Sequence, residues 1–172
     1  MITVEEFLKL PESGEFYYEL RHGEAIRLTR PKFGHTLIQH RLQNLLAQAA
    51  GSMGVVTIQL PFRALPEYEL RTAELAFLTQ ARWDGGDPED NLRGAPELVI
   101  EVLSPSDFLG EIKDKERLCL ENGAQEFWMV DPNLCQVKMS TPDGITTTYR
   151  AAQEIPLRVC GSGSIPVDDI FS

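Results

Sequence analysis

The feature that most constrains this chain is an apolar run broken by one carboxylate, ELVIEVL at residues 97–103. A near-continuous apolar run of this length is typical of a strand that is covered on both faces of a sheet. A second buried strand, QEFWMVDP, follows a helix predicted over residues 107–122. Buried strands separated by a helix predict a mixed sheet with helices on its faces, so the fold class that we expect is α/β (an α+β mixed sheet).

The rest of the chain supplies further elements around these strands. A capping box of Thr3 and Glu6 predicts a short helix over residues 4–9, and apolar residues at helical spacing predict a second helix over residues 35–50. A tight turn at residues 21–23 predicts a β-hairpin over residues 16–28. The other expected segments are strands at residues 55–60 and 69–78 separated by Pro61 and Pro66, a long polar loop at residues 79–96, and a C-terminal antiparallel meander of QVKMS, ITTTYR and IPLRV.

Length and composition narrow the class of protein. A chain of 172 residues without a linker or an internal repeat predicts a single domain over residues 1–172. Because the N-terminus has no leader pattern and no run reaches about eighteen apolar residues, we expect a cytoplasmic protein that does not span a membrane. The three cysteines match no metal-ligand spacing. The 16 basic and 26 acidic residues give a net charge of −10, so a nucleic-acid partner would need a local basic patch or a metal ion.

Glu101 is the carboxylate inside the apolar run, and Glu74 repeats the anomaly in the neighbouring strand TAELAFL. An ionised carboxylate buried without partners costs roughly several kcal/mol, so Glu101 must be paired, protonated or bound to a cation. Two inward carboxylates repel each other unless a cation lies between them, and Mg²⁺ or Mn²⁺ prefers such oxygen ligands. The alternatives are an edge strand or a salt bridge for Glu101, and a solvated position near the strand end for Glu74.

Lys115 lies on the apolar stripe of the helix that follows Glu101, together with Phe108, Ile112 and Cys119. Its ammonium group could reach back to the two carboxylates, or it could extend to the surface with its stem packed on apolar neighbours. Two carboxylates on a metal ion together with a lysine form a known arrangement for phosphodiester hydrolysis.

Several segments carry a resemblance to a known family. MITVEEFLKLP, YYELRHGEAIRL, RPKFGHTLIQHRLQNLL, RTAELAFL, GAPELVIEVLSPS and NGAQEFWMVDP resemble the Uma-two (Uma2) family of restriction endonucleases, which belongs to the PD-(D/E)XK nuclease-like superfamily. The resemblance runs from about residue 2 to residue 138. It implies a restriction-endonuclease-like core with a mixed sheet, an N-terminal hairpin and C-terminal antiparallel strands, and it implies DNA as the substrate.

The resemblance also implies roles for individual residues. Glu74 stands where the family usually has the aspartate of a Pro-Asp pair, and Glu101 is the acidic residue of the second motif, so these two would hold Mg²⁺ or Mn²⁺. The superfamily lysine normally lies two residues after the second acid, a position occupied here by Leu103, and Lys115 matches a relocated lysine. Glu19 in YYEL matches a recurrent family position and would be an auxiliary acid.

One basic segment runs against the overall charge. Residues 21–41 hold five basic residues against Glu24, a segment charge of +4, and the candidate nucleic-acid-binding residues within it are Arg30, Lys32, His35 and Arg41. This segment would form a phosphate-facing surface. The alternatives are scattered solvated arginines and, for His35, a structural or capping histidine.

The leading hypothesis is therefore a metal-dependent endonuclease that acts on DNA. The alternative is a catalytically degenerate nucleic-acid-binding or protein-interaction module of the same fold, which the replacement of Pro-Asp by Ala73-Glu74 suggests. A third interpretation makes Glu101 and Lys115 a buried ion pair without a ligand. We also expect a homodimer, because cutting two antiparallel strands favours two-fold symmetry and because the C-terminal meander leaves strand edges to cover.

Overall fold

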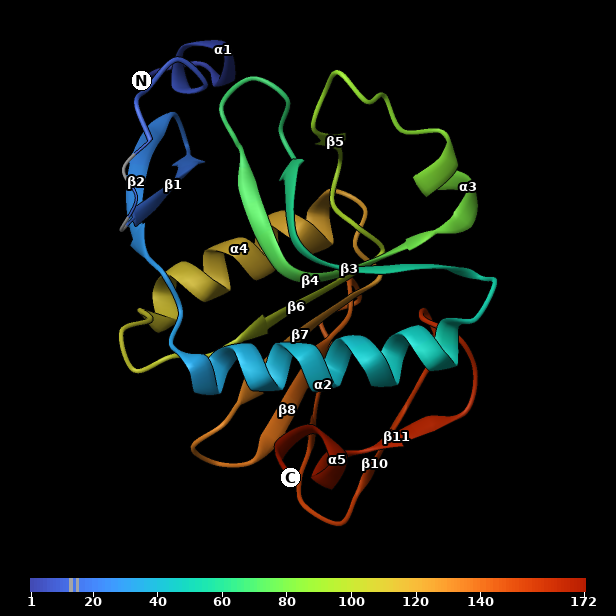
Figure 1. Cartoon of the computed structure of the whole chain (residues 1–172). Coiled ribbons are helices and arrows are strands. Elements are labelled where there is room, and N and C mark those ends of the chain that lie inside the picture. The colour runs from blue at the N-terminus through green and yellow to red at the C-terminus, as the bar shows by residue number, and fades with distance from the viewer. Residues whose placement is uncertain (13, 15) are drawn as a thin grey trace.

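A mixed β-sheet forms the centre of the molecule (Figure 1). The computed structural model describes residues 1–12, 14 and 16–172, and the sheet in this part of the chain has seven strands in the order β5-β3-β4-β6-β7-β8-β9. The strands are β3 (Gly54–Arg63), β4 (Arg71–Thr79), β5 (Leu92–Arg93), β6 (Leu98–Val102), β7 (Glu126–Asp131), β8 (Gln136–Ser140) and β9 (Thr146–Tyr149). The predicted mixed α/β sheet is confirmed, with β6 and β7 parallel and β4 antiparallel to β6.

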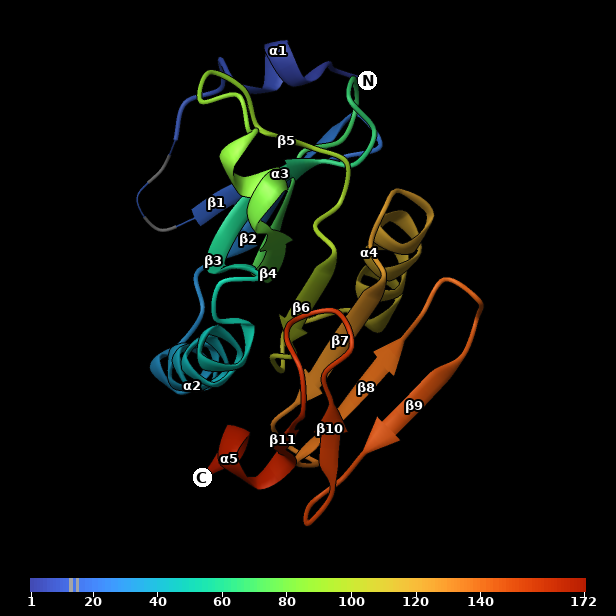
Figure 2. The same cartoon turned by 90° about the vertical axis from the view of Figure 1, so that its right-hand side faces the viewer.

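Two long helices cover the sheet from opposite sides, as Figure 2 shows. Helix α2 (Phe33–Ala50) packs Ile38, Leu42 and Leu46 against one face. Helix α4 (Leu109–Glu121) joins β6 to β7 and packs Leu118 and Cys119 against the other face. The sheet between them is apolar on both sides, which explains the continuous burial of β6.

The N-terminal hairpin lies against the beginning of β4. Strands β1 (Phe16–Arg21) and β2 (Glu24–Thr29) are joined by His22 and Gly23, which have φ values of 49° and 75°. Two left-handed residues in a two-residue loop are the signature of a tight hairpin turn, so the predicted hairpin is confirmed. A bridge between Leu20 and Leu70 attaches it to the sheet. The first helix, α1 (Val4–Phe7), has the predicted capping box but is two residues shorter than expected.

Three predictions about local structure are wrong. Pro61 does not end a strand but lies inside β3. The neighbouring strand β5 pairs with β3 only from Phe62 onward, so the proline nitrogen, which has no hydrogen to donate, faces a free edge. The expected polar loop contains a short helix, α3 (Gln80–Asp84), as well as β5. The segment IPLRV does not extend the meander: β10 (Glu154–Pro156) pairs with β11 (Ser164–Pro166) in a separate ribbon.

The C-terminal ribbon covers the α2 side of the sheet instead of lengthening it. Ile155 and Ile165 from the ribbon, and Val167 and Ile170 from helix α5 (Val167–Phe171), join the same apolar cluster as α2. Burial of these side chains stabilises the return of the chain across the sheet. It depends on contacts between segments that are distant in sequence, which strand periodicity does not reveal. No helix in the described residues is long and apolar enough to cross a membrane.

Candidate active site

Glu74 and Glu101 lie where β4 and β6 part from each other. The ladder between the two strands runs from Phe77 and Leu98 to Leu75 and Ile100, and the two glutamates come next. Beyond the ladder, side chains replace backbone pairing: Val102 N donates to Glu74 Oε2 at 2.6 Å, and Glu74 N donates to Glu101 Oε1 at 3.3 Å. The two carboxylates therefore bind each other's strand, as the neighbouring-strand prediction requires.

The other edge of Glu74 is distorted as well. Gln59 on β3 has a φ of 52°, and its position falls between the pairs Ile58–Leu75 and Leu60–Ala73, opposite Glu74. A left-handed residue other than glycine costs about 1–2 kcal/mol. Strand β4 therefore leaves regular pairing on both sides at Glu74, and β3 and β4 curve strongly along their length (Figure 1). Backbone strain of this kind gathers at functional sites.

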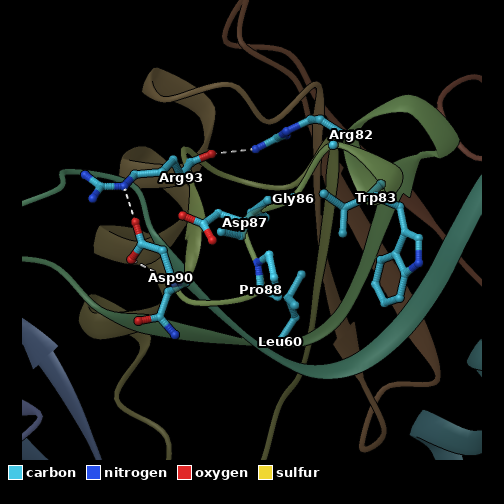
Figure 3. A pocket seen from close by; sticks show the side chains of 12 residues that line it. Leu60, Arg82, Trp83, Gly86, Asp87, Pro88, Asp90 and Arg93 are labelled. Atoms are coloured by element: carbon cyan, nitrogen blue, oxygen red, sulfur yellow. Dashed lines mark hydrogen bonds and ion pairs between the residues drawn. The ribbon is translucent and has the colours of Figure 1, made fainter.

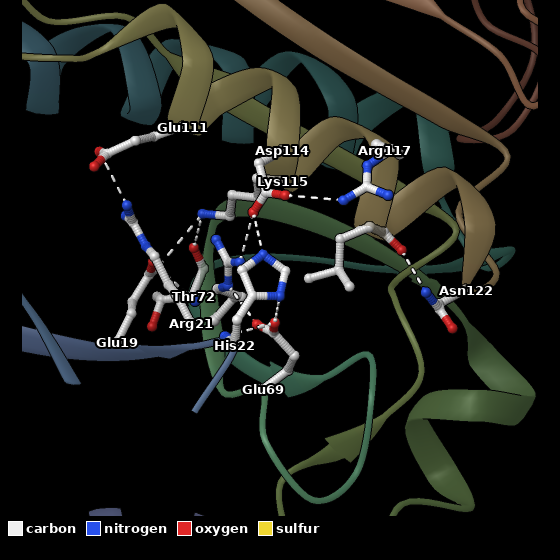
Figure 4. Close-up of polar contacts among 12 residues, drawn as sticks. Glu19, Arg21, His22, Glu69, Thr72, Glu111, Asp114, Lys115, Arg117 and Asn122 are labelled. Atoms are coloured by element: carbon white, nitrogen blue, oxygen red, sulfur yellow. Dashed lines mark hydrogen bonds and ion pairs between the residues drawn. The ribbon is translucent and has the colours of Figure 1, made fainter. Parts of the chain in front are cut away.

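Lys115 on α4 reaches the carboxylates, as its place on the apolar stripe predicts. Its Nζ atom lies 2.9 Å from Glu101 Oε1. It also lies 3.5 Å from Glu19 Oε1 and donates to Thr72 O at 2.5 Å (Figure 4). The Lys115 side chain is only 6% exposed, so it does not extend to the surface. The structure thus brings Glu74, Glu101, Lys115 and Glu19 together from four separate elements, β4, β6, α4 and β1.

Glu19 links the hairpin to the sheet and to α4. Its Oε1 accepts from Thr72 N at 2.9 Å, and its Oε2 accepts from Arg21 Nε at 2.9 Å. Arg21 in turn reaches Glu111 on α4 at 2.9 Å. Burial alone would raise the pKa of Glu19, but Lys115 and Arg21 outweigh it and hold that pKa below its usual value. Glu19 is therefore a fixed negative charge beside the lysine.

The pKa of Glu101 is shifted in the opposite direction from that of Glu19. Burial raises its pKa, and the Lys115 ammonium lowers it by less, while the Glu74 and Glu19 carboxylates add to the increase. Burial disfavours the charged form of Lys115 too, but Glu101 and Glu19 outweigh burial and raise the lysine pKa above its ordinary value. The Lys115 ammonium group is therefore held in its charged form between the Glu101 and Glu19 carboxylates.

His35 and the basic residues near it were predicted as a nucleic-acid-binding group. His35 is buried and its Nε2 atom lies 3.0 Å from Glu74 Oε1, so it belongs to the carboxylate site. Arg30 and Lys32 are exposed in the link between β2 and α2, and Arg30 Nε donates to Gly14 O at 3.2 Å. Arg41 is half-buried further along α2. Contact of these residues with DNA stays a prediction.

A second charged network, missed by sequence reasoning, fixes α4 beside the site (Figure 4). Arg71 is fully buried at the start of β4, and it contacts Glu69 Oε2 at 2.7 Å and Asp114 Oδ2 at 2.9 Å. His22 from the hairpin turn contacts the same two acids at 2.8 and 2.9 Å. The sequence signal was weak: Asp114 directly precedes the predicted site residue Lys115.

This network predicts loss of stability in acid. Burial would raise the pKa of Asp114, but hydrogen bonds from Arg71, His22 and Arg117 lower it from 3.8 to about 2. A depressed carboxyl pKa stabilises the fold above pH 4, and that contribution is lost as the pH falls toward 2. Because Asp114 is partly solvated, we expect about 1 kcal/mol. Urea unfolding at pH 5 and pH 2.5 should show a smaller acid loss for Asp114→Asn than for the wild type, and equal losses would contradict the assignment.

Cavities elsewhere do not include the site. One of about 610 Å³ lies between α3 and the loop before β5 and is lined by Leu60, Trp83, Asp87 and Arg93 among others (Figure 3). Another of about 470 Å³ lies between the outer face of α4 and β8. None of the predicted catalytic residues lines either cavity.

The carboxylate site has a donor set that suits a hard divalent cation. Glu74 is 17% exposed and therefore reachable from solvent, and Oε2 of Glu101 has no hydrogen-bond partner in the described part of the chain. Within residues 1–12, 14 and 16–172, no three His, Cys, Asp or Glu side chains lie close enough to enclose an ion by themselves. Mg²⁺ commonly takes one or two protein carboxylates and keeps water or phosphate oxygens for the rest, so the two glutamates fit such an ion.

Comparisons with known proteins identify a family and a similar fold. The family model Uma2, described as "Putative restriction endonuclease", matches residues 4–159. A crystal structure of a "putative nuclease belonging to DUF820" from Anabaena variabilis ATCC 29413 has a TM-score of 0.85 at 21% sequence identity, over 99% of this chain and 98% of that one. No curated protein matches. Because the family model spans most of the chain, this protein belongs to the Uma2 family.

Proposed function

We propose that the protein is a Mg²⁺- or Mn²⁺-dependent endonuclease that hydrolyses phosphodiester bonds in DNA. The observation that carries the proposal is the convergence of Glu101 and Lys115 at 2.9 Å beside Glu74, at the point where β4 and β6 separate. A buried charge with a free carboxylate oxygen, located where the pairing of β4 and β6 ends, lowers stability. Such costly charges are typical of functional sites. Family membership supplies the substrate class.

The residues of the chain take distinct roles in this proposal. Glu74 and Glu101 would hold the ion, which when bound polarises a phosphoryl oxygen and lowers the pKa of water. The Lys115 ammonium group offsets negative charge that develops on the phosphate. Glu19 holds Lys115 in place and keeps it protonated. Arg30 and Lys32, which are exposed in the link between β2 and α2, would bind flanking phosphates.

The proposal is tested by DNA cleavage with purified protein in Mg²⁺, in Mn²⁺ and in excess EDTA. We expect cleavage only with metal, and we expect Glu101→Gln to fall to the level of the EDTA reaction because the ligand charge is lost. Glu116→Gln, a change of a partly exposed glutamate on α4, is the matched control and should cleave as the wild type does. Equal cleavage by the wild type and Glu101→Gln would indicate a contaminating nuclease and contradict the site.

A second candidate is a nucleic-acid-binding or interaction module without hydrolysis. It is favoured by the observation that both Glu74 oxygens already have protein partners, His35 Nε2 and Val102 N. Calorimetric titration separates the two candidates. Failure to bind Mg²⁺ or Mn²⁺, together with DNA affinity that survives Glu101→Gln, would favour the binding module.

The quaternary structure and location belong to the same proposal. Cleavage of two antiparallel strands favours a homodimer, and β9, the last strand of the sheet, offers an unpaired edge for it. A cytoplasmic location would give such an enzyme access to DNA. Sedimentation of the protein with and without duplex DNA measures the assembly, and a monomer in both conditions would contradict the dimer.

A further inference from the structure

His35 is buried at an otherwise exposed helix end. Its side chain is 8% exposed, whereas Phe33, two residues earlier on α2, is 76% exposed. A histidine that contacts DNA phosphates should have its ring exposed to solvent. The ring of His35 instead points into the molecule, toward the place where β6 leaves β4.

The ring makes a defined pair of contacts there. His35 Nε2 lies 3.0 Å from Glu74 Oε1 and 2.9 Å from Val102 O. Both of these oxygens are acceptors, so Nε2 carries the hydrogen and donates to them. The other ring nitrogen, Nδ1, is buried and has no hydrogen-bond partner among the described residues. The polar contacts of the His35 ring with the described residues are therefore all at Nε2.

These contacts close a small ring of interactions around the Glu74 carboxylate. Val102 donates from its N–H to Glu74 Oε2 at 2.6 Å and accepts from His35 at its carbonyl. One carboxylate oxygen is thus held by β6 and the other by α2. Each carboxylate oxygen can accept more than one hydrogen bond or cation, so both remain available as ligands.

We propose that His35 is a positioning residue that fixes the orientation of the Glu74 carboxylate for a divalent cation. The inference rests on the proposed function and adds a residue to it. Glutamate has one more rotatable bond than the aspartate usual at this position in the family, and a metal site tolerates little misplacement of its ligands. Clamping both oxygens removes the extra freedom, and outer partners of this kind orient ligands in other metal sites.

The test measures metal affinity and DNA affinity separately. Mn²⁺ is titrated by calorimetry into the wild type, His35→Ala, His35→Gln and His40→Ala, and metal-free DNA affinity is measured on the same proteins. His40 is the control because it lies on α2, is exposed, and forms its side-chain hydrogen bond with Asn44, away from the carboxylate site. We expect His35→Ala to weaken Mn²⁺ binding about 10- to 100-fold, His35→Gln to recover part of it through its amide donor, and His40→Ala to match the wild type. Metal-free DNA affinity should not change.

The outcomes separate this inference from the proposed function. A folded His35→Ala protein with wild-type Mn²⁺ affinity overturns the positioning role, even where the wild type cleaves DNA. Loss of DNA affinity without loss of Mn²⁺ affinity overturns it in favour of a phosphate contact. Mn²⁺ binding that depends on His35 in a wild type that cleaves nothing supports the positioning role and overturns the nuclease. A wild type without Mn²⁺ binding overturns both. Thermal unfolding of each variant establishes that it is folded.

Discussion

Replacing Lys115 by methionine is expected to lower kcat/KM for DNA cleavage about 10²- to 10³-fold, the loss typical when one charge-stabilising donor is removed from an active site. Methionine keeps most of the length and the apolar stem of lysine, so the change removes the ammonium group and little packing. The loss should lie mainly in kcat, because the charge that Lys115 offsets develops on the phosphate during the reaction. Leu103, at the usual position of the lysine, cannot replace it.

The matched control is Lys113→Met, which removes an exposed lysine from the same helix two residues away. It should alter salt dependence at most, since an exposed charge contributes to long-range attraction rather than to the reacting centre. Cleavage by a folded Lys115→Met protein at the rate of the Lys113→Met protein would remove Lys115 from the mechanism. The raised pKa of Lys115 adds a second check, because no rate change near neutral pH should come from its deprotonation.

The sequence predicts the carboxylate site where a charge conflicts with burial. Glu101 interrupts an apolar strand and Lys115 interrupts an apolar helix stripe, and the structure pairs them at 2.9 Å. Such conflicts are visible in a single chain because strand and helix periodicity assign each position to a face. The role of Glu19 came from resemblance alone, since one charge on a hairpin strand carries no such conflict.

Other parts of the site depend on contacts between distant segments. Arg71, Asp114 and His22 meet only because α4, β4 and the hairpin turn pack at one place, and none of their own neighbours in sequence requires it. The left-handed Gln59 is equally hidden, because glutamine has no preference for that conformation. The segment IPLRV was assigned to the wrong sheet for the same reason: periodicity gives a strand its faces but not its partner.

Stability measurements on Glu101 and Lys115 test whether the pair is retained for structure or for function. We expect Lys115→Met to lower the free energy of unfolding by about 3 kcal/mol at pH 9.5, where the wild-type Glu101 is ionised, because it leaves Glu101 buried without its cation. Glu101→Leu should cost less, about 1–2 kcal/mol, since Glu19 and Thr72 O remain to receive the lysine. The double variant should be close to the wild type, because two apolar side chains of similar volume replace the whole pair.

The pH dependence of Lys115→Met distinguishes this explanation from simple loss of packing. Burial already raises the pKa of Glu101, and removal of Lys115 takes away the largest influence that lowers it. A carboxyl group with a raised folded pKa binds a proton more tightly when folded, so its destabilising effect grows as the pH rises from the unfolded value of 4.5 toward the folded one. The wild type shows the same effect up to its own folded pKa of about 8, so the deficit of Lys115→Met relative to the wild type grows only above that pH. Urea unfolding should therefore show a smaller deficit for Lys115→Met at pH 7 than at pH 9.5. A deficit in the free energy of unfolding that does not depend on pH would show that packing rather than charge stabilises these residues. A double variant as unstable as the sum of the two single changes would show the same. Restored stability without cleavage in the double variant would show that the pair is retained for the chemistry.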